Sequence, residues 1–149
     1  MYGEWDHFWR QGYGAEENAG GVCISSRGVW RQQIVHAEII TQGMAQFLIL
    51  EHEESRWGLL NVYAPNHASA RARLWEEIYL SLPEDVENWI VGGDFNMLED
   101  PQDRRGGSMI TIQGLELANW ERLVRKLRIY DMWHLSNFHK GVDSLRFSR

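Results

Sequence analysis

Residues 44–63 read MAQFLILEHEESRWGLLNVY, in which two apolar runs of strand length, 44–51 and 57–63, flank a short charged segment. Two further runs precede them, GGVCISS at 20–26 and QIVHAEII at 33–40, and glycine or polar residues separate all four. Short runs that are rich in β-branched and aromatic residues and bounded by turn-forming residues are typical of strands. The first half of the sequence therefore predicts four successive antiparallel strands.

The spacing of the apolar residues changes after residue 68. Between residues 69 and 82 the apolar side chains recur every three or four positions, as on one face of a helix, and Pro83 ends the pattern. NWIVGG at 88–93 is a further strand, and a second helical pattern follows at Trp120, Leu123, Val124 and Leu127. This order predicts an α/β fold in which helices pack against a layered sheet, and not a helical bundle or a β-sandwich.

The composition fits one domain over residues 1–149. The chain has 15 Lys and Arg against 21 Asp and Glu, a net charge of -6, so it would repel a polyanion unless basic side chains gather on one face. No apolar run approaches the roughly 18 residues of a membrane helix and nothing marks the chain for export, so we expect an intracellular protein with no membrane partner. The single cysteine, Cys23, lies in an apolar run and is expected to be buried.

The strand predicted at 88–93 runs directly into Asp94 and Asn96 in the string GGDFN. Because they are two positions apart on an extended chain, their side chains can point the same way from the end of a sheet. A carboxylate there can accept a proton from water or bind a divalent cation, and the amide can orient the water or the group under attack. A turn that merely ends the strand is the alternative, because Gly, Asp and Asn favour turns without any function.

A second candidate is NVYAPN at 61–66, at the end of another predicted strand. Pro65 fixes its own φ and favours an extended residue before it, so Tyr63 and Asn66 leave the strand end in a defined geometry. The phenol and the amide could donate hydrogen bonds to an anionic oxygen such as that of a phosphate. An ordinary Pro-Asn turn with the tyrosine in the core is the alternative.

Arg104 and Arg105 lie in a third polar segment, EDPQDRRGG at 99–107. They could reach a phosphate backbone, but alternating charges in a loop are also what a solvated surface carries. The six histidines show no H-E-x-x-H spacing and no G-x-S-x-G string accompanies them, which excludes the usual zinc and serine hydrolase motifs.

NVYAPN, GGDFN and the later YDMW at 130–133, in this order and at these separations, resemble the motifs of the endonuclease/exonuclease/phosphatase superfamily. The longer run WIVGGDFNMLEDPQDRRGG, together with RLW at 73–75 and GGV near the N-terminus, is most similar to the endonuclease domain of plant-type LINE (non-LTR) retrotransposons. The resemblance extends from about residue 20 to residue 147.

This resemblance implies a four-layered α/β sandwich of the DNase I type and a Mg²⁺-dependent, or Mn²⁺-dependent, hydrolysis of phosphodiesters in DNA, by an endonuclease of the retrotransposon type or one that cuts at abasic sites. Asp94 would orient or deprotonate the attacking water and touch the metal ion, and Asn96 would position the water or the phosphate. Tyr63 and Asn66 would contact the scissile phosphate, and Arg104 and Arg105 are further candidates for binding substrate phosphate. A retrotransposon origin implies a nuclear location and DNA as the partner, and the sequence leaves protein partners open.

Members of the superfamily also have a Gln-Glu pair near the N-terminal end and an Asp-His pair in the last strand. The Glu of the first pair binds the metal ion. Neither pair has a counterpart in this sequence. We therefore expect a domain that is incomplete at both ends and weakly active or inactive by itself. Two other functions stay open: a non-catalytic remnant that binds nucleic acid, and a phosphomonoesterase of the same superfamily.

Overall fold

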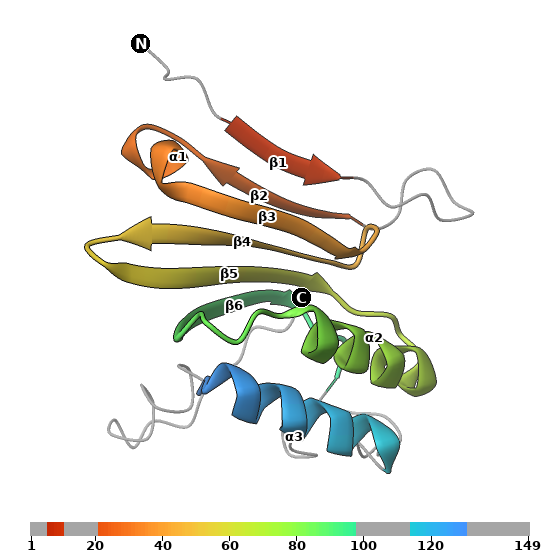
Figure 1. Cartoon of the computed structure of the whole chain (residues 1–149). Coiled ribbons are helices and arrows are strands. Elements are labelled where there is room, and N and C mark those ends of the chain that lie inside the picture. Colours follow the sequence, from red (N-terminus) through yellow and green to blue (C-terminus); the bar gives the residue numbers. More distant parts are fainter. Residues whose placement is uncertain (1–5, 11–20, 98–113, 131–149) are drawn as a thin grey trace, which may run out of the picture.

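The computed structural model describes residues 6–10, 21–97 and 114–130, and for residues 6–10 it describes the backbone (Figure 1). The chain contains both strands and helices, as an α/β fold requires. In chain order the elements are β1 (Asp6–Arg10), β2 (Val22–Ser26), α1 (Val29–Gln33), β3 (Ile34–Thr41), β4 (Ala45–His52), β5 (Ser55–Tyr63), α2 (Ala68–Ser81), β6 (Asn88–Asp94) and α3 (Leu115–Leu127).

Four strands form the main sheet, in the order β3-β4-β5-β6. β3, β4 and β5 follow one another as antiparallel neighbours, which confirms the predicted antiparallel succession for these three strands. β6 runs parallel to β5. Parallel neighbours need a crossover connection, and α2 provides it by returning the chain along one face of the sheet before β6 begins.

The strand predicted at 20–26 is present as β2, but its predicted pairing was wrong. β2 does not join β3; it pairs with β1 in a separate two-stranded sheet, and α1 separates the two strands along the chain. β2 packs against β4 and β5, and the Asn61 side-chain amide donates a hydrogen bond to the Cys23 backbone carbonyl at 2.9 Å. Cys23 is exposed and not buried as expected, because alternate strand residues face opposite ways and the neighbouring Val22 is the buried one.

The hydrophobic core lies between one face of the main sheet and the helices α2 and α3, which run side by side below the sheet in Figure 1. Trp75 of α2 is fully buried and packs against the rings of Phe95 and Trp120, with centroids 6.2 and 5.1 Å away. Each helix buries a stripe of residues at three and four spacing, as the sequence predicted. Among the other core residues are Phe47, Ile49, Leu60, Val62, Leu74, Ile78, Leu123 and Leu127.

β2 covers part of the opposite face of the main sheet. Between β2 and that face lies a cavity of about 580 Å³, whose apolar lining includes Ile24, Leu48, Leu50, Trp57, Leu59 and Ile90. Helices, the four-stranded sheet and the two-stranded sheet therefore form successive layers. Within the part of the chain that the structure describes, no helix has the length and apolar character needed to cross a membrane.

Candidate functional site

The site begins where β5 and β6 end at the same edge of the main sheet. Because these strands are parallel neighbours, their carboxyl ends lie side by side, which is where open α/β sheets bind ligands. Tyr63 is the last residue of β5, Asp94 is the last residue of β6, and the two are register partners. Register partners on neighbouring strands point to the same face of a sheet.

Both of these side chains are accessible to solvent. Tyr63 is 37% exposed and Asp94 is also exposed. The phenol and the carboxylate therefore share one accessible edge of the sheet. The alternative interpretation placed Tyr63 in the core, and the exposure of its side chain contradicts that part of it.

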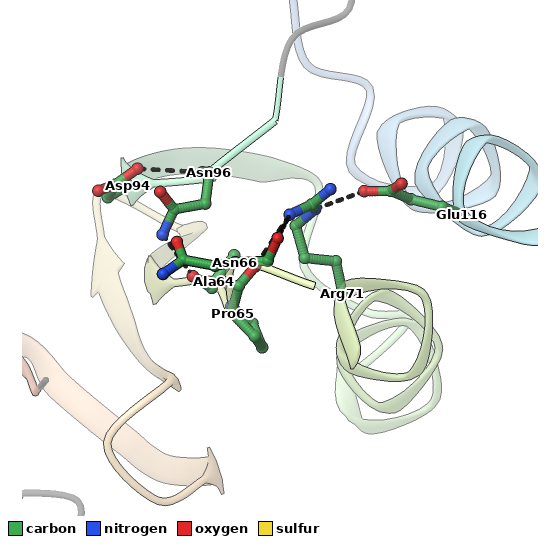
Figure 2. Close-up of polar contacts among 7 residues, drawn as sticks. All are labelled: Ala64, Pro65, Asn66, Arg71, Asp94, Asn96 and Glu116. Atoms are coloured by element: carbon green, nitrogen blue, oxygen red, sulfur yellow. Dashed lines mark hydrogen bonds and ion pairs between the residues drawn. The ribbon is translucent and has the colours of Figure 1, made fainter. Parts of the chain in front are cut away.

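Asp94 and Asn96 form a turn that ties the two strand ends together (Figure 2). Asp94 Oδ1 accepts a hydrogen bond from the Asn96 backbone N–H at 3.0 Å, and Asn96 Nδ2 donates to the Ala64 carbonyl at 2.6 Å. The Ala64 N–H donates in turn to the Asp94 backbone carbonyl at 2.8 Å. Asn96 has a φ of 48°, a conformation that asparagine tolerates better than most residues. The strand-ending turn is thus present, and it holds the exposed Asp94 carboxylate in place.

A buried arginine, Arg71, fixes the loop that follows β5. Its Nη1 donates to the backbone carbonyls of Pro65 at 3.1 Å and of Asn66 at 2.7 Å. Its Nε donates to the carboxylate of Glu116 at 2.5 Å, and the two residues are only 6% and 3% exposed. The first turns of α2 and α3 are therefore joined beneath the loop by an ion pair that solvent hardly reaches.

Figure 2 shows how the two groups of side chains divide around this loop. Asp94, Asn96 and the side-chain amide of Asn66 gather on one side, while Arg71 and Glu116 lie on the other. Asn66 is exposed, so its amide is accessible, while its backbone carbonyl is held by the buried arginine. Nothing in the sequence singles out Arg71, because a charged residue of an amphipathic helix is ordinarily expected on its solvent face.

The described residues offer oxygen ligands at this edge. The Asp94 carboxylate and the side-chain oxygens of Asn66 and Asn96 are of the hard type that Mg²⁺ or Mn²⁺ takes. Within residues 6–10, 21–97 and 114–130, no three His, Cys, Asp or Glu side chains gather closely enough to hold a metal ion. Arg104, Arg105 and residues 131–133 of the YDMW string lie outside the described residues.

Comparison with known proteins gives a limited similarity. No protein-family model matches the chain. The chain is 31% identical over 86 residues to the "Transposon TX1 uncharacterized 149 kDa protein" of Xenopus laevis. The matched part covers 56% of this chain and only 7% of that protein, so the chain corresponds to a small part of its relative. The similarity points to a protein derived from a transposable element.

Proposed function

We propose that this chain is a metal-dependent phosphodiesterase that cuts DNA, an endonuclease of retrotransposon origin. The observation that carries the proposal is the meeting of Tyr63 and Asp94 at one accessible sheet edge. A phosphodiester at this edge would meet a carboxylate, a phenol and the amides of Asn66 and Asn96. Hydrolysis by in-line attack needs a positioned water, a group that takes its proton and donors for the phosphate oxygens, and these side chains can supply them.

The residue roles follow from the chemistry of each group. Asp94 Oδ2 would accept the proton of the attacking water or orient that water, because Oδ1 already receives the Asn96 N–H. The Tyr63 hydroxyl and the Asn66 amide would donate hydrogen bonds to the non-bridging phosphate oxygens. Asn96 keeps its side-chain oxygen available to the water, since its nitrogen donates to Ala64. Arg104 and Arg105 are proposed as further phosphate contacts on the sequence alone.

A divalent cation is the proposed cofactor. Mg²⁺ in phosphate-processing sites is commonly bound by one or two carboxylates, waters and the substrate phosphate, and Asp94 with the amide oxygens of Asn66 and Asn96 fits that pattern. Mg²⁺ or Mn²⁺ would supply positive charge against the charge that develops on the phosphate oxygens. With one carboxylate in the described part of the site, we expect weak metal binding without DNA and slow hydrolysis.

The DNase I-like four-layered sandwich belongs to the same proposal. The order of a helix layer, the main sheet and a two-stranded sheet supports this part of the proposal. The similarity to a transposon protein supports the origin from a mobile element. A chromosomal DNA substrate would place the working protein in the nucleus.

Nicking of supercoiled plasmid tests this function. In the presence of Mg²⁺, an excess of the chain should slowly convert supercoiled plasmid to open circles, and EDTA should stop the reaction. Asp94→Asn preserves the size of the side chain but removes its charge, so the rate should fall about a hundredfold or more. Asp85→Asn is the matched control, because Asp85 is an aspartate with a 67% exposed side chain in the loop before β6, at the other end of that strand.

Three results would contradict the proposal. Equal nicking by the wild type and Asp94→Asn would remove Asp94 from the chemistry. DNA binding without any nicking would indicate a nucleic-acid-binding module, and faster turnover of small phosphate monoesters than of plasmid would indicate a phosphomonoesterase.

A further inference from the structure

A second cavity, whose lining is largely polar, lies at the other end of the helix layer, away from Tyr63 and Asp94. The C-terminal halves of α2 and α3, the segment between α2 and β6, and the start of β6 border a solvent-open space of about 410 Å³. Because α2 has 14 residues and a helix rises about 1.5 Å per residue, this space lies roughly 20 Å from the loop that precedes α2. The side chains that decide its chemistry are Tyr79, Glu84, Trp89, Arg122, Arg125 and Lys126.

The wall of this cavity is basic in a chain that is acidic overall. Its lining contains three cationic side chains, those of Arg122, Arg125 and Lys126, and one carboxylate, that of Glu84. The whole chain, by contrast, has a net charge of -6. Arg122 is three positions before Arg125 and four before Lys126, so the three cations lie on the same side of α3 and repel one another. A bound anion would relieve this repulsion.

Two of the cations are held in place by protein groups. Lys126 Nζ donates hydrogen bonds to the carbonyls of Tyr79 and Leu82, both at 2.8 Å, and so caps the C-terminal end of α2. Arg125 donates its Nε to the Glu121 carbonyl at 3.2 Å and forms an ion pair with the Glu121 carboxylate at 3.6 Å. This ion pair is exposed, with side chains 74% and 55% accessible, so it can rearrange at little cost.

Arg122 is the cation that a ligand can use most directly. Its guanidinium carbon stands 4.4 Å from the centroid of the Tyr79 ring, which supports it from one side. Among the described residues its N–H groups have no hydrogen-bonding or ion-pair partner. A guanidinium presents its N–H groups as a planar fork that matches two oxygens of a phosphate. The ring contact restricts this fork before a ligand arrives, which lowers the entropy lost on binding.

We propose that this cavity binds the phosphodiester backbone of a nucleic acid, with Arg122 as the main contact and Arg125 as the second. The anionic character of the ligand follows from the cavity itself. Its assignment to a nucleic acid rests on the proposed function. This contact is separate from the strand-end site and needs no metal ion.

Binding of fluorescein-labelled DNA, measured by anisotropy across a salt series in EDTA, tests the proposal. Arg122→Gln and Arg125→Gln should each raise Kd roughly threefold to tenfold at low salt, and Arg122→Gln should reduce the slope of log Kd against log salt by about one. Arg73→Gln is the matched control, because Arg73 is an exposed arginine on α2 that does not line the cavity. Its Kd should stay close to that of the wild type.

A second variant guards against loss of structure. Circular dichroism should show that each variant is folded. Arg122→Lys keeps a cation above Tyr79 but loses the fork, so it should weaken binding by about twofold or more while leaving the salt slope unchanged.

Several outcomes would overturn the assignment. If Arg73→Gln weakens DNA binding as much as Arg122→Gln does, the effect comes from the net charge of the protein and not from the cavity. If Arg122→Gln binds DNA as tightly as the wild type, the cavity does not contact DNA. Inorganic phosphate that binds in an Arg122-dependent way, with no measurable DNA binding, would exclude the nucleic acid. Absence of nicking by the wild type, together with intact Arg122-dependent binding in EDTA, would refute only the strand-end chemistry.

Discussion

Gly93 of β6 lies directly against the backbone of Val62, its register partner in β5, and a Cβ at position 93 would be 1.8 Å from the Val62 carbonyl oxygen. Gly93 also has a φ of 135°, which residues with side chains rarely adopt. Gly92, by contrast, has nothing within 4 Å of the position of its missing Cβ. The second glycine of GGDFN therefore allows the close approach of strands that sets Asp94 beside Tyr63.

The two glycines should differ sharply on substitution. Gly93→Ala should lower the free energy of unfolding by about 2 kcal/mol or more, because the new Cβ meets backbone and the φ is unfavourable. Gly92→Ala should change it by less than about 1 kcal/mol. Urea unfolding of both variants checks this. Similar losses of unfolding free energy in the two variants would show that the contact with Val62 is not the reason why position 93 needs glycine.

The buried pair of Arg71 and Glu116 should be costly to break from either side. Arg71→Met or Glu116→Leu should each destabilise the fold by about 3–5 kcal/mol, because each leaves its partner without an ion pair in a site that solvent hardly reaches. The double variant Arg71→Met/Glu116→Leu should recover much of this loss, since no charge is left unpaired. Removing the exposed pair with Arg125→Gln should cost less than about 1 kcal/mol.

Denaturant unfolding of the wild type, the two single variants and the double variant forms a double-mutant cycle, and Arg125→Gln is the exposed control. Additive losses in the double variant would mean that the two side chains act independently. Arg71 would then stabilise the loop through Pro65 and Asn66 alone.

Tyr63→Phe should slow the reaction without destabilising the fold. The ring is 37% exposed and its hydroxyl is expected to bind substrate, so the free energy of unfolding should change by less than about 1 kcal/mol. Loss of one hydrogen bond to a charged phosphate should slow plasmid nicking about tenfold or more. An unchanged nicking rate would show that the phenol does not touch the scissile group.

Asn96 should be replaced better by glycine than by alanine. Both changes remove the hydrogen bond to Ala64, but alanine must also hold a φ of 48°, which costs a residue with a Cβ about 1 kcal/mol. The thermal midpoint should therefore fall in the order wild type, Asn96→Gly, Asn96→Ala. A more stable alanine variant would mean that the left-handed turn opens when the side chain is lost.

The regular elements from residue 33 onward were predictable from the sequence because their signals are local. The apolar runs at 33–40, 44–51 and 57–63 became β3, β4 and β5, and the three and four spacing around Trp75 and Leu123 became α2 and α3. Period and turn residues report on the conformation of a short segment. They say nothing of which distant segment it will meet, which is why the pairing of β2 with β1 and the exposure of Cys23 were missed.

The sequence by itself determined which residues could form a polar edge, since Tyr63, Asn66, Asp94 and Asn96 all follow apolar strand runs. Only the tertiary structure decided that Tyr63 and Asp94 are neighbours, because their register depends on the parallel crossover through α2. It also decided that Arg71 is buried, through a carboxylate 45 positions further along the chain. Contacts between distant segments form when whole faces of helices and sheets pack together, and no local pattern records their partners.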